Sequence, residues 1–142
     1  MIAVYGNSNL TIDIATLFAI ECARAGERTL LVELGEGTNP KLSYAFAIED
    51  QVIKTTDYYL DNIKNLHMNA CLLKKNDICD MLTYSEKALT TIIKKLPDNL
   101  SILPRKVPSD DLELSEDEYK EAIEKIRREG FENHDKIFIA LS

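Results

Sequence analysis

The segment from Gly6 to Asp13 is the part of this 142-residue sequence whose position and polar residues point most directly to chemistry. It reads Gly-Asn-Ser-Asn-Leu-Thr-Ile-Asp and joins an apolar run ending at Tyr5 to a long helical pattern. A loop that leads from a strand into a helix lies beside the helix N-terminus, where free backbone amides attract phosphate groups. In folds that alternate strands and helices, ligands bind at that edge of the sheet. Phosphate binding is therefore the first chemistry to test against these residues.

The residues of this segment do not supply what a nucleoside triphosphate requires. A phosphate-binding loop needs glycines for close approach of the backbone, a lysine for the β- and γ-phosphates and a hydroxyl group for Mg²⁺. The segment has one glycine and no lysine, and Asp13 adds a negative charge at its end. We expect Asp13 to cap the helix N-terminus instead.

The segment is thus predicted to be a degenerate phosphate-binding loop, with no cofactor and no metal. Residual nucleotide binding through backbone amides is the alternative. The degenerate loop consists of Gly6, Asn7, Ser8, Asn9, Leu10, Thr11, Ile12 and Asp13.

Strands and helices that alternate along the chain position this loop. Residues 2–5 and 29–34 are apolar runs of strand length, and the helical pattern 12–25 between them closes at Gly26. Such a unit predicts a parallel pair of strands. Further strands are predicted at 70–73, 100–103 and 136–141, a short helix near 59–63, and two longer helices that begin at the capping boxes Thr83-Tyr84-Ser85-Glu86 and Ser115-Glu116-Asp117-Glu118 and end at Pro97 and Gly130.

This order of elements predicts an α/β fold with a mainly parallel sheet and helices on both faces, in a Rossmann-like three-layer α/β/α arrangement. We find no linker within the sequence and expect residues 1–142 to form a single domain.

The first helix has more apolar residues than one buried face requires. Its first stripe contains Ile12, Ala15, Ala19 and Cys22-Ala23, and we expect it to pack on the sheet. The second stripe consists of Ile14, Leu17 and Ile20. We interpret the second stripe as a candidate interface with a protein partner, for which a second copy of the chain is one candidate.

Two stretches of the chain resemble a known family. The first has an apolar strand, a glycine-bearing loop, a helix ending Ala-Arg-Ala-Gly and the strand Thr-Leu-Leu-Val-Glu-Leu. The second has Asn-Leu-Ser-Ile-Leu-Pro at 99–104 and, after a helix, His-Asp-Lys-Ile-Phe-Ile-Ala at 134–140. Together, over residues 1–35 and 98–142, they resemble ParA/MinD-type ATPases of the SIMIBI class. The resemblance implies a P-loop NTPase-like fold.

The family's catalytic residues can be carried over position by position. Its deviant Walker A motif, K-G-G-x-G-K-[ST]-[ST], places the signature lysine on Gly6, the phosphate-binding lysine on Thr11 and the magnesium-binding hydroxyl on Ile12. The second acid of the D-x-D sequence that ends the family's second strand falls on Gly35. The Walker B aspartate falls on Ala140. The resemblance therefore implies that three separate parts of the hydrolytic machinery are missing.

Composition and charge exclude several classes of function. The sequence is 45% hydrophobic and 29% charged, which is typical of a globular domain. Its net charge of −7 and its lack of a cluster of lysine and arginine argue against direct nucleic-acid binding. We find no secretory signal and no apolar run of the length of a membrane helix, so we expect a cytoplasmic protein without membrane insertion. The 3 cysteines lack metal-binding spacing.

Two other groups of residues have a structural and a functional interpretation. His134 precedes a predicted strand, and we expect it in a surface loop. The carboxylates between Asp110 and Glu118 are interpreted as a solvated loop and helix start, and alternatively as a docking surface for a basic partner.

The sequence as a whole favours a catalytically inactive, bacterial ParA/MinD-like domain, a pseudo-ATPase that acts through protein partners. By resemblance, its role would be localisation or assembly, as in partition, conjugation, secretion or pilus systems, with the TadZ/CpaE proteins as the nearest analogy. One alternative is an ATPase with a non-standard loop that binds ATP. A second is a receiver-like signalling module, although no predicted strand supplies a clear phospho-acceptor aspartate.

Overall fold

A computed structural model describes residues 1–5, 10–35, 42–43, 46, 48, 52–82, 93–107 and 113–141. Four strands form a single parallel sheet in the order β1-β4-β2-β3. Their bounds are β1 Ile2–Tyr5, β2 Thr29–Glu33, β3 Leu100–Leu103 and β4 Lys136–Leu141. The helices are α1 Leu10–Arg24, α3 Thr56–Asp61, the 3-10 helix η1 Met68–Cys71, α4 Lys75–Met81 and α6 Glu116–Gly130.

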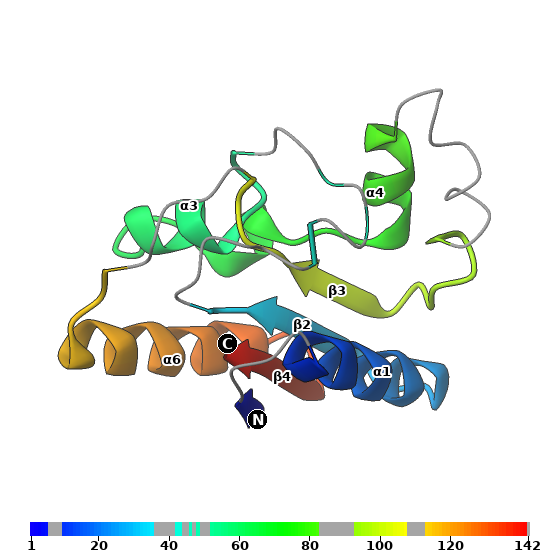
Figure 1. Ribbon diagram of the computed structural model, residues 1–142, viewed down its shortest axis with the longest axis horizontal. Coiled ribbons are helices and arrows are strands. Elements are labelled where there is room, and N and C mark those ends of the chain that lie inside the picture. The colour runs from blue at the N-terminus through cyan, green and yellow to red at the C-terminus, as the bar shows by residue number, and fades with distance from the viewer. Residues whose placement is uncertain are drawn as a thin grey trace.

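The sheet separates two hydrophobic clusters, which confirms the predicted α/β fold with helices on both faces (Figure 1). On one face, α1 and α4 pack through Ile12, Ala15 and Ile78. On the other, α3, η1 and α6 pack through residues that include Tyr59 and Ile126. Every residue of β2 is buried, as expected of a central strand in a parallel sheet.

Two glycines stand at the ends of the long helices for different physical reasons. Gly26 follows α1 with a φ of 96°, the left-handed conformation that favours glycine at a helix C-terminus. Gly130 is instead the last residue of α6. A Cβ atom there would lie 2.5 Å from Cδ1 of Ile137, so glycine allows α6 to lie close to the sheet.

The predicted capping box at the start of α6 is confirmed. The Ser115 hydroxyl accepts a hydrogen bond from the Glu118 N–H at 3.2 Å, and the Glu118 carboxylate accepts one from the Ser115 N–H at 3.1 Å. The exchange lowers the pKa of the Glu118 carboxyl. The other predicted capping box, at residues 83–86, lies outside the described residues.

The prediction of a strand at residues 70–73 is wrong. The chain forms η1 there, and Leu73 alone makes an isolated antiparallel bridge to Ile102. His67 caps η1 by accepting a hydrogen bond from the Asn69 N–H at 3.1 Å, so a polar side chain before the apolar run decides its local structure. In the part of the chain that the structure describes, no helix is long and apolar enough to cross a membrane.

Candidate functional site at the carboxyl edge of the sheet

The sheet brings the predicted catalytic positions to one edge. In the strand register, Ala140 lies between Val4 of β1 and Glu33 of β2. The end of β1, the end of β2 and the Walker B position on β4 are therefore neighbours in space. Residues 6–9 of the degenerate loop lie outside the described residues, and so do the side chains that a ligand would meet there.

The start of α1 has a negative charge and buried side chains where a phosphate site would have exposed polar donors. The helix begins at Leu10, two residues earlier than predicted, so Asp13 lies within its first turn and not at the cap position. The prediction that Asp13 is the capping residue is therefore wrong, although its charge still lies near the positive end of the helix dipole. Ile12, at the position matched to the magnesium-binding hydroxyl, is 2% exposed and packs in the core. Thr11 is also buried, at 3% exposure.

Glu33, the one acid at the end of β2, binds the protein's own backbone. It is 2% exposed, and its carboxylate accepts hydrogen bonds from the N–H of Arg105 at 3.2 Å and of Leu42 at 3.4 Å. A carboxylate with backbone donors of this kind ties together the segments that follow β2 and β3. Gly35, matched to the second acid, contributes its carbonyl oxygen to the same cluster.

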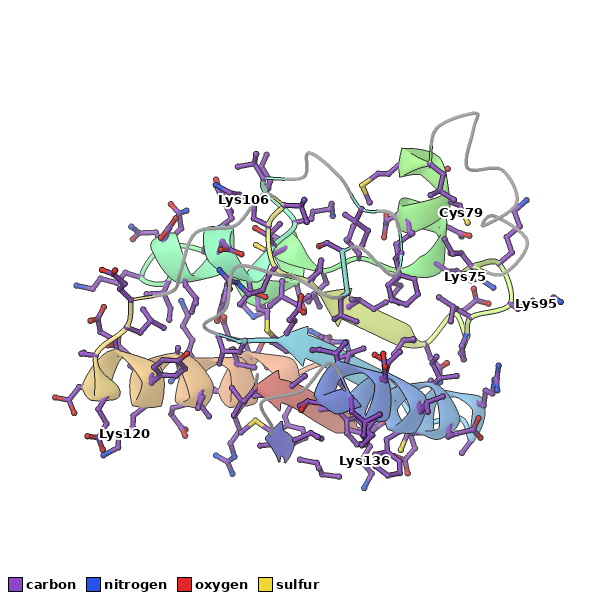
Figure 2. The ribbon with its side chains drawn as sticks, in the orientation of Figure 1. Lys75, Cys79, Lys95, Lys106, Lys120 and Lys136 are labelled. Atoms are coloured by element: carbon purple, nitrogen blue, oxygen red, sulfur yellow. The ribbon has the colours of Figure 1, made fainter. Side chains whose placement is uncertain are left out.

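Arg105 is the largest of the fully buried side chains in the described residues, at 1% exposure. Its Nη1 donates to the Gly35 carbonyl at 2.7 Å, and its Nη2 forms an ion pair with Asp57 at 2.9 Å. The Asp57 carboxylate also accepts the Lys106 N–H at 2.7 Å. Figure 2 shows Lys106 in the segment that follows β3, beside α3.

Thr56 and Ser43 complete this polar cluster. The Thr56 hydroxyl donates its single proton to the carbonyl of Glu33 at 2.8 Å, and the carbonyl of Leu103 lies farther away at 3.2 Å. The Ser43 hydroxyl donates to the Arg105 carbonyl at 2.5 Å. Sequence reasoning missed this cluster because its members are far apart in the chain and belong to no local motif.

Among the described residues, the polar groups at this edge have a structural role. The Glu33 carboxylate, the Arg105 guanidinium and the hydroxyls of Thr56 and Ser43 form hydrogen bonds with the main chain of β2 and of the segments that follow β2 and β3. Each of these polar groups therefore has a protein partner. Within the described residues, no group of three or more histidine, cysteine, aspartate or glutamate side chains could hold a metal ion.

The structure places the predicted interface stripe of α1 at two levels of exposure. Leu17 is 63% exposed, whereas Ile14 and Ile20 are half-buried, and Ile20 packs against the core. Phe18, which sequence reasoning left out, is 54% exposed and stacks on Phe138 of β4 with ring centroids 6.4 Å apart.

Exposed apolar residues continue from α1 onto the edge strand. Ile2 of β1 is 47% exposed and is the register partner of Phe138, on which Phe18 stacks. We call the surface formed by Ile2, Leu17 and Phe18 the α1–β1 surface.

The remaining predicted groups fall in separate places. Cys22, Cys71 and Cys79 are free, and burial raises the pKa of the Cys71 thiol to about 11, so this thiol is unreactive. Glu113 and the acids in the first turn of α6 are exposed, whereas Asp110 and Asp111 lie outside the described residues. His134 is 6% exposed, so its expected place in a surface loop is wrong: its ring binds the end of α6.

Comparison with known proteins identifies the fold. No protein-family model and no curated protein sequence matches the chain. Among solved structures, the chain is similar to a chain of the MinC:MinD cell division protein complex of Aquifex aeolicus, with a TM-score of 0.54 and 18% sequence identity. The match covers 99% of this chain and 46% of the other, so the chain spans less than half the length of that protein. At this identity the likeness shows the P-loop NTPase-like fold alone, which agrees with the resemblance seen in the sequence.

Proposed function

We propose that this chain is a ParA/MinD-like domain that does not hydrolyse nucleotide and acts by binding a protein partner, in a localisation or assembly role. The proposal has two parts, a silent carboxyl edge and an interaction surface on α1 and β1. The likeness to a protein of the MinC:MinD complex, which is an assembly of proteins, supports the second part in general terms.

The observation that carries the silent edge is the burial of Ile12. Its side chain occupies the core at the position where the family places the magnesium ligand, and the acid of β2 is engaged by backbone donors. An isoleucine has no oxygen atom that could bind magnesium, and its buried position leaves no polar side chain there for a hydrated magnesium ion.

The experiment for this part is a calorimetric titration with magnesium and a non-hydrolysable ATP analogue, with ADP in parallel. We expect no heat of binding at high micromolar protein. Magnesium-dependent binding would overturn the proposal and favour the competing ATPase with a non-standard loop, in which residual amide contacts hold the phosphates.

The interaction surface rests on the α1–β1 surface. Soluble proteins expose single apolar side chains routinely, but contiguous ones mark interaction sites. β1 is also an edge strand, and it pairs only with β4 among the described strands. An unpaired strand edge with exposed apolar residues beside it is suited to contact with another chain. A second copy of this chain is the partner that we propose first.

Sedimentation analysis of the protein and two variants tests this surface. Leu17→Glu should weaken self-association at least about tenfold, because a charge would be buried at the centre of the contact. Val52→Glu is the matched control, since Val52 is 56% exposed and lies outside α1 and β1. Self-association that is equal in both variants would contradict the proposed surface.

A further inference from the structure

A polar hollow lies at the amino edge of the sheet, opposite the edge at which α1 begins. Its volume is about 350 Å³, and its walls come from η1, the start of α4, β3 and the α6–β4 connection. Ser101 lies near the beginning of β3, and His134 lies two residues before β4. The residues that define its chemistry are Asn69, Lys74, Asp77, Ser101, Asn133 and His134.

His134 lines this hollow and has one ring nitrogen that can accept a hydrogen bond. Its Nδ1 lies 2.9 Å from the Gly130 carbonyl, which only accepts, so Nδ1 carries the proton. Burial lowers the pKa of His134, and the charges of Lys74 and Arg28 lower it further. The ring is therefore neutral near pH 7, and Nε2 has a free lone pair. No hydrogen bond to Nε2 forms among the described residues.

Ser101 is the second buried polar residue of the wall, at 2% exposure. Its hydroxyl has no hydrogen-bond partner in the described part of the chain. In the described residues, the only side-chain polar atoms that are both inaccessible to solvent and without a partner are Thr16 Oγ1 and Glu27 Oε2. The Ser101 hydroxyl is not one of them. The Ser101 hydroxyl must therefore reach open space, and the hollow is the space that Ser101 lines.

The rim of the hollow adds donors and one cation. Lys74 lines the hollow and forms no ion pair within the described residues. The carboxamides of Asn69 and Asn133 likewise have no side-chain partner there. Asp77 caps α4 by accepting the Lys74 N–H at 2.8 Å, and its carboxylate adds a negative charge to the rim.

We propose that this hollow binds a small hydroxycarboxylate, a molecule with one carboxylate and at least one hydroxyl group. Lys74 and the two carboxamides donate to the carboxylate, while a ligand hydroxyl donates to His134 Nε2 and accepts from Ser101. The rim has one cation, Lys74, and one anion, Asp77, so it disfavours a dianion more strongly than a ligand with a single negative charge. A phosphate dianion is disfavoured because it needs more cationic donors and because the neutral histidine offers a lone pair and not a proton.

Titration of the ¹⁵N-labelled protein with glycerate, followed by NMR, tests the proposal. We expect saturable shifts at Asn69, Ser101 and Asn133, with a dissociation constant in the millimolar range. Acetate, which lacks the hydroxyl, and inorganic phosphate should bind at least about fivefold more weakly. Equal binding of all three anions, or the absence of saturable shifts with glycerate, would overturn the proposal.

Variants separate the site from a general attraction of anions. Lys74→Met should weaken glycerate binding about tenfold, whereas Lys120→Met should leave it unchanged. Lys120 lies on α6, well away from α4 in the view of Figure 2, and pairs with Glu116 at 3.4 Å. Ser101→Ala removes one hydroxyl from a folded wall and should weaken binding at least about threefold. Unaltered binding in both Lys74→Met and Ser101→Ala would also refute the site.

Discussion

At the carboxyl edge of the sheet, Glu33, Arg105 and Thr56 direct their polar groups to other parts of the protein. At the amino edge, Ser101 and His134 have polar atoms without a partner among the described residues. Both sets are at least nine-tenths buried. Burial alone therefore does not distinguish a structural cluster from a binding site. The difference lies in the hydrogen bonds, because a buried polar group that lacks a protein partner needs water or a ligand.

The two edges of this sheet reverse the usual arrangement of an α/β sheet, in which ligands bind at the carboxyl edge. Here Arg105 fills the space behind β2 and β3, and Ile12 fills the start of α1. Substitutions at the carboxyl edge should therefore act mainly on the free energy of unfolding. Changes at the amino edge should act mainly on binding.

The largest effect is expected from Arg105→Met. It leaves the Asp57 carboxylate, whose side chain is 14% exposed, without its ion-pair partner and removes the bond to Gly35. Removing one partner of a buried pair costs about 3–5 kcal/mol, and we expect a loss of that size in urea denaturation.

The control is Arg28→Met, which removes a surface ion pair. Arg28 and Asp135 lie 2.9 Å apart, with side chains that are 57% and 46% exposed. This variant should change stability far less, because exposed pairs contribute little. Similar losses in the two variants would contradict the view of Arg105 as a buried structural element.

Thr56→Val should have the second largest effect. The variant keeps the shape of the side chain but leaves the Glu33 carbonyl without the hydroxyl that lies 2.8 Å from it. Loss of a buried hydrogen bond costs about 1–3 kcal/mol. Thermal unfolding of the variant measures the loss, and a stability equal to that of the wild type would show that the carboxyl-edge cluster does not need this hydroxyl.

The pH dependence of His134 gives a smaller effect. Its pKa in the folded protein lies below the ordinary value of 6.5. When pH falls below about 6.5, the unfolded chain binds a proton that folded His134 resists, so stability decreases toward the lowered folded pKa. Above that pH both states are neutral and this contribution stays constant.

Urea denaturation at a series of pH values between 5 and 8, together with NMR titration of the His134 ring, checks this dependence. Hydrogen bonds with Arg28 lower the pKa of the Asp135 carboxyl from its ordinary value of 3.8 to about 2. The contribution of Asp135 to stability is therefore lost only as pH falls from 3.8 toward 2. The two transitions are thus separated. A His134 ring that titrates above 6.5 would contradict the assignment of a neutral, buried imidazole.

Sequence patterns predicted the parts of the fold that depend on local spacing. The apolar runs of β1, β2, β3 and β4 and the capping box of α6 follow from neighbouring residues, and each is present. Ala140, which the resemblance matches to the Walker B aspartate, lies in register between β1 and β2, because parallel strands that end together meet at one edge.

Neither polar cluster could be predicted in the same way. Asp57 and Arg105 are separated by 48 residues, and His134 was assigned to the surface because it precedes a strand in a polar stretch. Its burial depends on the carbonyl of Gly130, at the point where that glycine lets α6 approach Ile137. Contacts of this kind depend on the packing of distant elements and leave no periodic signal in the sequence.

Ser101→Ala is the smallest expected change in stability and the sharpest test of the comparison. It removes a hydroxyl of a 2%-exposed residue, as Thr56→Val does for a residue that is 0% exposed. Because the Ser101 hydroxyl has no partner in the described residues, its loss breaks no protein hydrogen bond. We expect the free energy of unfolding to change by less than about 0.5 kcal/mol, since the deletion also removes the cost of an unpaired polar group.

Denaturation of both hydroxyl variants under one condition measures the contrast. A loss for Ser101→Ala as large as that for Thr56→Val would mean that the amino-edge hydroxyl already has a structural role, and the distinction between the two edges would then fail.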